Sequence, residues 1–267
     1  MTSFFTPSDD VVQPYALMDL DDTLFQTMRK IEAWDIPTTA PDELVCASVN
    51  REGQPLSFMS ARQAAFFNWL LASTELIVVT ARDTDEIKRV RLPFNSWQVL
   101  THGAVIMTPD NTALDTWSAH MHRTLTALQD KIRDIQTHLH QTQPDLKVRV
   151  HSDTFCDKTL AIYISIKHPQ KDHAALQTLA QQLPQQIATV DQDFYIHVNA
   201  NNLAILPHAV HKKHAVQFLL EHHLAPQRPS FGFGDSLADM PFLQCLDWYG
   251  TPSRGQLHDQ WQNSLPH

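Results

Sequence analysis

The 267-residue sequence predicts an α/β fold, in which a mostly parallel β-sheet carries helices on both faces. Short apolar runs alternate with segments of helical periodicity, which is typical of parallel strands joined by helical crossovers. The runs predicted as strands are 15–19, 76–80, 97–101 and 230–234. The segments predicted as helices are 61–71, 84–91 and 209–220. In such sheets ligands bind beyond the carboxyl ends of the strands, so the residues that follow each strand are the candidates for a site.

The middle of the chain has a different pattern, which predicts a second domain inserted into the first. A long polar helix is followed by two strands, a second helix and two more strands, the order αββαββ. These predicted elements are 115–143, 147–150, 160–167, 170–183, 187–190 and 194–198. The expected division is a core of residues 1–108 and 203–267 and an α+β domain of residues 109–202. Polar stretches at 109–111 and 199–202 are the expected connectors.

A further hairpin is predicted in an insertion at about residues 40–60. Val45–Val49 and Pro55–Phe58 are β-rich, and the turn-forming segment Asn50–Gln54 separates them. Because this insertion comes soon after the first strand, we expect the hairpin to lie over the site.

Composition excludes several classes of protein. The net charge is -9 and the pI is near 5.9, which argues against a nucleic-acid or membrane partner. Residues 1–10 lack the basic and apolar regions of a signal peptide, and no apolar run approaches a membrane span. The three cysteines are far apart and form no disulfide framework. We therefore expect a cytoplasmic protein, as a monomer or a homodimer.

The segment that follows the first predicted strand concentrates carboxylates. Asp19, Asp21 and Asp22 lie within four residues, directly after an apolar strand. Charges at a buried strand end cost free energy unless they are paired, and Mg²⁺ is the usual partner of such carboxylates. Asp19 and Asp21 project to the same side of an extended chain, so one carboxylate could attack while the other handles a proton.

Three other segments place reactive side chains at element boundaries. Thr80 ends a buried strand and Arg82 follows, so a hydroxyl and the N–H groups of a helix start could bind phosphate. Lys212 stands at the start of a predicted helix and offers an ammonium group. Asp235 and Asp239 follow the last predicted strand, beside glycines that allow close backbone approach.

These four segments, in this order, resemble the haloacid dehalogenase-like hydrolase superfamily over almost the whole core. The resemblance implies a Rossmann-like core. The αββαββ insertion resembles the larger cap domain of the Cof-type and sucrose-phosphatase branches, and Thr101–Ile106 resembles the Asn-Gly-Ala segment before that cap. The chain departs from the family pattern at His102, Lys213 and Ala238, where Asn, Gly and Asn are usual. None of these departures removes a catalytic group.

The resemblance implies a role for each catalytic residue. Asp19 would be the nucleophile and form an aspartyl-phosphate, and Asp21 would be the general acid and then the general base. Thr80 would bind a phosphoryl oxygen. Lys212 would bind substrate and neutralise charge; it is preferred to Lys213 because the family's Lys precedes Ala by three residues.

The resemblance also implies a Mg²⁺ site. Asp19, Asp235 and the backbone carbonyl of Asp21 would hold the ion, with Asp239 assisting directly or through water. Arg82 would either contact substrate or pair with an exposed carboxylate. Asp22 is expected to have a structural role in the turn.

The predicted function is Mg²⁺-dependent hydrolysis of a small phosphorylated metabolite, with sugar phosphates among the candidates. One alternative is a phosphotransferase or phosphomutase that uses the same intermediate. Another is a ligand-sensing protein that has the fold without turnover. In the cap, Tyr163, Tyr195 and His197 either face the substrate or only line the sheet.

Overall fold

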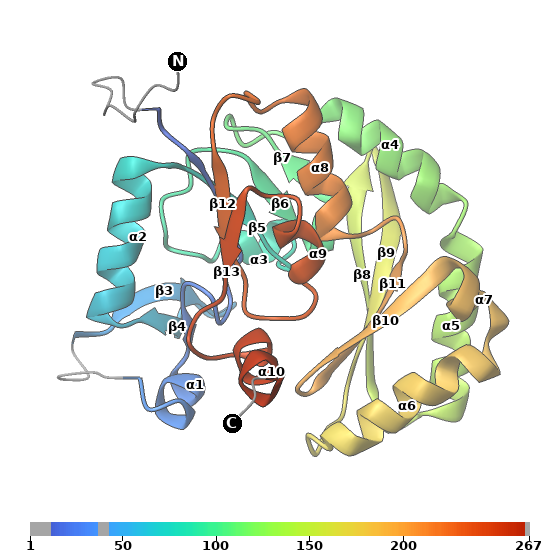
Figure 1. The fold of residues 1–267 in the computed structure, drawn as a ribbon. Coiled ribbons are helices and arrows are strands. Elements are labelled where there is room, and N and C mark those ends of the chain that lie inside the picture. Colours follow the sequence, from blue (N-terminus) through green and yellow to red (C-terminus); the bar gives the residue numbers. More distant parts are fainter. Residues whose placement is uncertain (1–11, 37–42, 265–267) are drawn as a thin grey trace.

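A computed structural model describes residues 12–36 and 43–264, so the signal-peptide prediction for residues 1–10 lies outside the described part. The α/β fold is confirmed: a six-stranded sheet has the order β13-β12-β1-β5-β6-β7 (Figure 1). Its strands are β1 (Tyr15–Met18), β5 (Glu75–Val79), β6 (Gln98–Leu100), β7 (Val105–Met107), β12 (Ser230–Phe233) and β13 (Trp248–Gly250). All neighbouring strands are parallel except the pair β6-β7.

Helices cover both faces of this sheet because its side chains alternate between two cores. Ala16 and Met18 of β1 pack into one apolar cluster with Phe67 of α2 (Ala61–Ser73). Leu17 packs into the other cluster with Val216 of α8 (Lys212–His222). The helices of this part are α1 (Met28–Ala33), α2 (Ala61–Ser73), α3 (Thr84–Ile87), α8 (Lys212–His222), α9 (Met240–Leu243) and α10 (Gln256–Ser264). The predicted helix 84–91 is shorter than expected, because α3 ends at Ile87, and the predicted helix 209–220 is displaced to Lys212–His222.

The middle of the chain forms a separate antiparallel sheet of four strands, in the order β10-β11-β9-β8. Its elements are α4 (Asp115–Thr126), α5 (Gln129–Thr142), β8 (Lys147–Phe155), β9 (Lys158–Lys167), α6 (His173–Gln186), α7 (Ala188–Asp193), β10 (Phe194–Asn199) and β11 (Asn202–Pro207). Ile164 and Ile166 of β9 pack against α5 and α6 on one face of the sheet. The opposite face is turned toward the six-stranded sheet (Figure 1).

Three predictions for this region are wrong in detail. The long helix over 115–143 is two helices, because the chain breaks between α4 and α5. The strand predicted at 187–190 is the start of α7, since a short apolar run does not distinguish a strand from a buried helical turn. The segment 199–202 is the turn between β10 and β11 rather than a connector, so the predicted boundary at 202–203 falls within a strand of the four-stranded sheet. The division into a core and an inserted domain otherwise stays a prediction.

The hairpin in the insertion is present. β3 (Val45–Val49) and β4 (Pro55–Met59) pair antiparallel, and β2 (Gln26–Thr27) adds a third strand in the order β2-β4-β3. A hydrogen bond from the Val49 N–H to the Arg89 carbonyl, 2.9 Å long, ties the hairpin to the segment after α3. Among the helices of the described residues, none is long and apolar enough to cross a membrane.

Candidate active site

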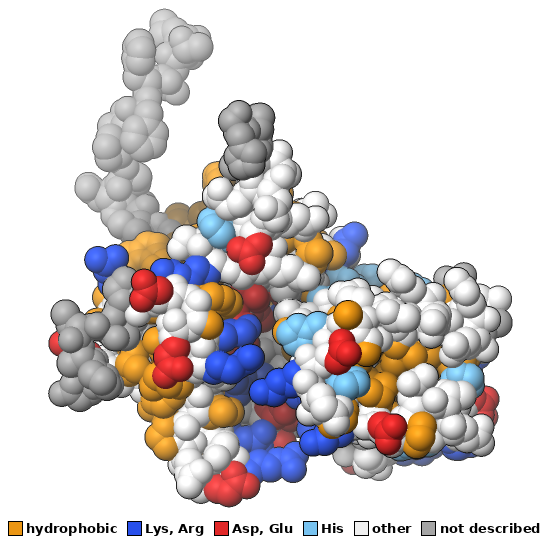
Figure 2. All heavy atoms as spheres, turned by 90° about the horizontal axis from the view of Figure 1, so that it is seen from below, with side chains coloured by type: hydrophobic (Ala, Val, Ile, Leu, Met, Phe, Trp, Pro, Cys, Tyr) orange, Lys and Arg blue, Asp and Glu red, His pale blue; other side chains and the backbone are white. Residues whose placement is uncertain are grey.

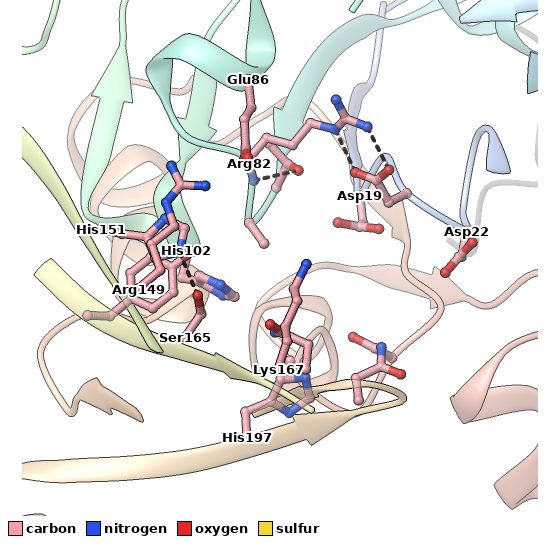
Figure 3. A pocket seen from close by; sticks show the side chains of 18 of the residues that line it. Asp19, Asp22, Arg82, Glu86, His102, Arg149, His151, Ser165, Lys167 and His197 are labelled. Atoms are coloured by element: carbon pink, nitrogen blue, oxygen red, sulfur yellow. Dashed lines mark hydrogen bonds and ion pairs between the residues drawn. The ribbon is translucent and has the colours of Figure 1, made fainter. Parts of the chain in front are cut away.

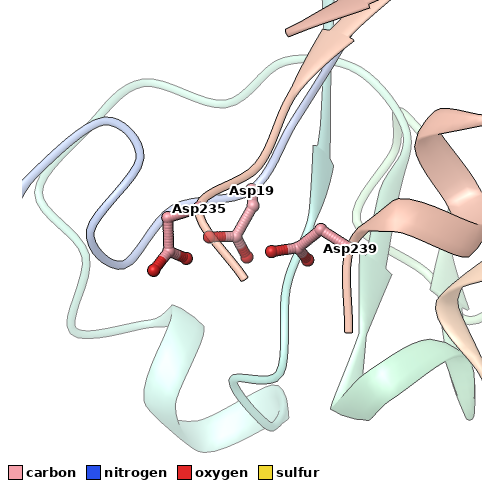
Figure 4. A group of neighbouring side chains, drawn as sticks. All are labelled: Asp19, Asp235 and Asp239. Atoms are coloured by element: carbon pink, nitrogen blue, oxygen red, sulfur yellow. The ribbon is translucent and has the colours of Figure 1, made fainter. Parts of the chain in front are cut away.

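Three carboxylates from two neighbouring strand ends meet at the carboxyl edge of the sheet. Asp19 follows β1, while Asp235 and Asp239 follow β12, and these strands are parallel neighbours. Figure 4 shows the three side chains next to one another. One oxygen from each carboxylate lies within 4.8 Å of the others, and all three residues are buried. The structure therefore brings together three of the four predicted metal ligands.

Lys212 is the cation of this cluster. Its Nζ donates hydrogen bonds to Asp19 Oδ1 at 2.8 Å and to Asp239 Oδ1 at 2.6 Å. Burial acts to lower the pKa of Lys212, but the two carboxylates outweigh it and raise that pKa, so the ammonium stays charged. Lys212 is the first residue of α8, and its neighbour Lys213 makes no such contact. The choice of Lys212 over Lys213 thus agrees with the geometry.

One lysine does not balance three buried carboxylates. Burial, together with the neighbouring carboxylates, raises the pKa of Asp19 to about 7, although Lys212 opposes the rise. The same causes raise the pKa of Asp235 to about 9. Asp239 Oδ2 accepts hydrogen bonds from the Ser236 N–H and hydroxyl at 3.0 and 2.7 Å. Within the described residues, the Asp235 carboxylate has no donor. The cluster is therefore an oxygen-rich, electron-rich site that fits a hard divalent cation.

We expect the stability of the metal-free protein to depend on pH through Asp235. Because its pKa is raised on folding, the folded state holds the proton more tightly, and the contribution of Asp235 to stability is lost as pH rises toward about 9. A one-unit rise in pKa corresponds to about 1.4 kcal/mol. Asp235→Asn should therefore raise the free energy of unfolding at pH 8 by at least about 1.4 kcal/mol without divalent cations. Urea unfolding at pH 5 and pH 8 measures this; an equal effect at both pH values would contradict it.

Two glycines allow the close approach of segments in the site. A Cβ on Gly234 would lie 2.5 Å from the Asp239 Cβ, so only glycine lets these two residues meet. Gly103 has a φ of +98°, and a Cβ there would lie 2.4 Å from the His211 carbonyl oxygen. The segment after β6 can therefore pack directly against the start of α8, which carries Lys212.

Asp21 lies outside the acidic cluster and is held by Arg82. The guanidinium donates from Nε to Asp21 Oδ2 at 2.7 Å and from Nη2 to Oδ1 at 2.8 Å. Of the two alternatives for Arg82, the structure shows the carboxylate pair. The Asp21 side chain is 48% exposed, so it remains open to a ligand. Its backbone carbonyl as a metal ligand stays a prediction.

The remaining predicted residues lie around the cluster. Thr80 is buried after β5, and its hydroxyl accepts a hydrogen bond from the Arg82 N–H at 3.2 Å. The Thr23 hydroxyl donates to Asp19 Oδ2 at 3.0 Å and so orients that carboxylate. Asp22 has a φ of +67° and pairs with Lys30, which agrees with the predicted turn role.

A cavity of about 780 Å³ opens above the cluster, between the six-stranded and four-stranded sheets. Its lining includes Asp19, Thr80 and Lys212 of the part with the six-stranded sheet, and Tyr163 and His197 of the four-stranded sheet. Figure 3 shows Asp19 and His197 on opposite sides of this cavity. Tyr195 is not among the lining residues, and its hydroxyl donates to the Val210 carbonyl at 3.0 Å. Of the three cap residues left open by the sequence, two therefore face the cavity and Tyr195 does not.

Sequence reasoning missed a group of basic residues in this cavity. Lys147, Arg149 and Lys167 line it from β8 and β9, and Arg51 lines it from the β3–β4 hairpin. Figure 2 shows Lys and Arg side chains gathered along the hollow between the two parts of the molecule. The signal was present in the sequence, since basic residues alternate with valines over 147–150.

The family model of the haloacid dehalogenase-like hydrolases matches residues 115–248, half of the chain. The fold, and the acidic cluster at the carboxyl edge of the parallel sheet, agree with this class of protein, the hydrolases. The chain belongs to the haloacid dehalogenase-like hydrolase family, which confirms the resemblance and the predicted enzyme class.

Solved structures share the fold at low sequence identity. The sucrose-phosphatase of Synechocystis, in complex with sucrose and phosphate, is 16% identical with a TM-score of 0.56, over 95% of this chain and 90% of that one. The C-terminal domain of trehalose-6-phosphate phosphatase from C. albicans is 14% identical with a TM-score of 0.55, over 95% and 78%. The sequence has no match among curated proteins.

Proposed function

We propose that this chain is a Mg²⁺-dependent phosphatase that hydrolyses a small phosphomonoester through an aspartyl-phosphate on Asp19. The observation that carries the proposal is the contact of the buried Asp19 with Lys212, beside Asp235 and Asp239 at one side of the cavity. Sugar phosphates are candidate substrates, because phosphatases named for sucrose and trehalose 6-phosphate share the fold. The cavity volume is in the range of small-molecule sites.

In the first step, an oxygen of Asp19 attacks the phosphorus atom and forms the Asp19–phosphate bond. The bond from phosphorus to the leaving alkoxide breaks, and Asp21 gives that alkoxide a proton. Lys212 holds Asp19 in place through its 2.8 Å hydrogen bond and offsets the negative charge of the phosphoryl oxygens. Thr80 would donate its hydroxyl to one of these oxygens.

In the second step, water attacks the phosphorus atom and the bond to Asp19 breaks. Asp21 accepts the proton of the water and returns to its starting form. Arg82 donates to both Asp21 oxygens in the structure, so this pair would have to open at the oxygen that carries the proton before Asp21 acts as the acid. Closure of the cap sheet over the cavity would exclude bulk water during the first step.

The acidic cluster fits the metal ion that this chemistry needs. Asp19 and Asp235 would bind Mg²⁺, and Asp239 would assist directly or through water. When bound, the ion neutralises charge on the phosphoryl group. We also propose a cytoplasmic location, since Cys46, Cys156 and Cys245 are all free thiols.

Release of phosphate from an aryl phosphate tests the proposal. We expect turnover with Mg²⁺ and a loss of at least about a hundredfold with EDTA, restored by added Mg²⁺. Analysis of products with and without a sugar acceptor separates hydrolysis from phosphotransfer, because transfer would leave a new phosphorylated sugar. No turnover of any phosphomonoester with Mg²⁺, Mn²⁺ or Co²⁺ would overturn the proposal and favour a ligand sensor.

A further inference from the structure

One face of the four-stranded sheet is built from polar and basic side chains. Alternate residues of a strand share a face, so Lys147 and Arg149 of β8 lie on one side and Val148 and Val150 on the other. The valines pack against the core under the helices. The opposite face meets the cavity, and in Figure 3 Arg149 and Lys167 lie on the cavity wall across from Asp19.

Two lysines stand directly opposite each other on this face. Lys147 of β8 pairs with Lys167 of β9 in the antiparallel register. Like charges in a directly opposed cross-strand pair are destabilising. Neither lysine has an ion-pair partner among the described residues, whereas Arg149 forms an ion pair with Asp83, from Nη2 to Oδ2 at 3.6 Å. We expect the Lys147–Lys167 pair to lower the stability of the fold when no ligand is bound. An anion bound between the two ammonium groups would remove this repulsion.

Among the described residues, the acidic side chains of the cavity form no ion pair with Lys147 or Lys167. Asp21 is paired with Arg82, and Asp22 is paired with Lys30. Glu86 accepts a hydrogen bond from the Asp83 N–H at 3.3 Å as part of the capping box of α3. Apart from Glu86, the carboxylates that remain in the cavity lining are Asp19 and Asp235 of the buried cluster, which Lys212 and a metal ion would balance.

The nearby histidines contribute no positive charge. Burial, together with Arg149, lowers the pKa of His151 to about 4, and burial lowers the pKa of His102 well below its usual value. His151 Nε2 is hydrogen-bonded to the Ser165 hydroxyl at 2.8 Å. The positive charge on this face of the four-stranded sheet therefore comes from its lysines and arginines and not from its histidines.

We propose that the substrate carries a second anionic group, a carboxylate or a second phosphate, which Lys147, Arg149 and Lys167 bind while the phosphate to be removed lies at Asp19. This inference rests on the proposed phosphatase function and names its substrate class: a phosphorylated sugar acid or a bisphosphate, rather than a phosphate of a neutral sugar. Two charge-assisted contacts at opposite ends of the cavity would also fix the orientation of the substrate.

Matched pairs of substrates test this inference. The pairs are glycerol 3-phosphate with 3-phosphoglycerate, glucose 6-phosphate with 6-phosphogluconate, and fructose 6-phosphate with fructose 1,6-bisphosphate. We expect kcat/KM to favour the member with the second anion by at least tenfold in one or more pairs. A preference in the first two pairs indicates a carboxylate, and a preference in the third alone indicates a second phosphate.

The double variant K147Q/K167Q should reduce that preference at least tenfold. Lys158→Gln is the matched control, because Lys158 lies on the same strand as Lys167 and is not part of the cavity lining; it should keep the preference. The unfolding midpoint of K147Q/K167Q should equal or exceed that of the wild type, since the like-charge pair is removed.

The outcomes separate this inference from the function on which it rests. No turnover of any phosphate, the aryl phosphate included, would overturn both. Turnover without a charge preference in all three pairs would overturn the inference alone. A double variant that slows both members of a pair equally would also overturn the inference. The lysines would then attract any anionic substrate and would not bind a second anionic group.

Discussion

Replacing Asp19 by Asn should abolish phosphate release while the fold is retained. Asn keeps the size of the side chain but lacks the anionic oxygen that attacks phosphorus, so the covalent intermediate cannot form. We expect kcat to fall by at least roughly a thousandfold. Stability should not fall, because Asp19 is a buried carboxylate whose pKa burial raises to about 7, and Lys212 keeps its partner Asp239. Initial rates with an aryl phosphate and Mg²⁺ measure the loss.

Asp22→Asn is the matched control for this experiment. Asp22 lies three residues from Asp19, but it pairs with Lys30 and occupies a turn with positive φ. Asn also tolerates this backbone conformation, so the variant should keep most of the wild-type rate. Activity of Asp19→Asn above a few per cent of the wild type would contradict the mechanism. Equal losses in both variants would instead point to a general effect of charge near the cavity.

The acidic cluster could be predicted from the sequence because each of its parts follows a strand. Parallel neighbours end at the same edge of a sheet, so residues after β1 and β12 had to meet there. Periodicity alone did not predict that the start of α8 lies at this edge of the sheet. Lys212 was assigned to the site by the resemblance to the family. The pairing of Asp21 with Arg82 could not be predicted, because it depends on side-chain rotamers of two separate loops.

The four-stranded sheet was harder to predict than the parallel one. The run Leu203–Leu206 is apolar throughout, as in a core strand, and its antiparallel pairing with β9 and β10 is a long-range property. The run Ile187–Val190 has strand-like composition, yet Val190 packs in a helical turn under the sheet. Both assignments depend on tertiary packing, and for this reason the predicted end of the insertion at residue 202 coincides with the start of β11.

The basic wall of the cavity depends on the same packing. Sequence alternation over Lys147–Val150 already separates a basic face from an apolar face. Which face meets the acidic cluster is decided by α5 and α6, which cover the apolar side. Contacts between the two parts then hold this wall over the site: the Thr84 hydroxyl donates to Asp153 Oδ2 at 2.8 Å, and Arg149 approaches Asp83.

Replacing Lys212 by Met should cost both activity and stability. Met keeps much of the side-chain volume but leaves Asp19 and Asp239 buried without their ammonium partner. Removal of one partner from a buried ion pair typically costs about 3 to 5 kcal/mol, and we expect a loss of this size at pH 8 without divalent cations. Activity should fall by at least roughly a hundredfold, since the charge on Asp19 and on the phosphoryl oxygens is no longer offset.

The pH dependence of this loss distinguishes charge from packing. Without Lys212 no ammonium group offsets the repulsion among the buried carboxylates, so the pKa values of Asp19 and Asp235 rise further and the folded state binds more protons than the unfolded state. Stability then falls as pH rises, and the loss should be smaller at pH 5 than at pH 8. Mg²⁺ should recover part of it at pH 8. Lys213→Met, at the neighbouring position outside the cluster, should change stability little at either pH. A loss in Lys212→Met that is the same at pH 5 and pH 8 and unaffected by Mg²⁺ would mean that Lys212 stabilises the fold by packing, and the electrostatic account of the site would fail.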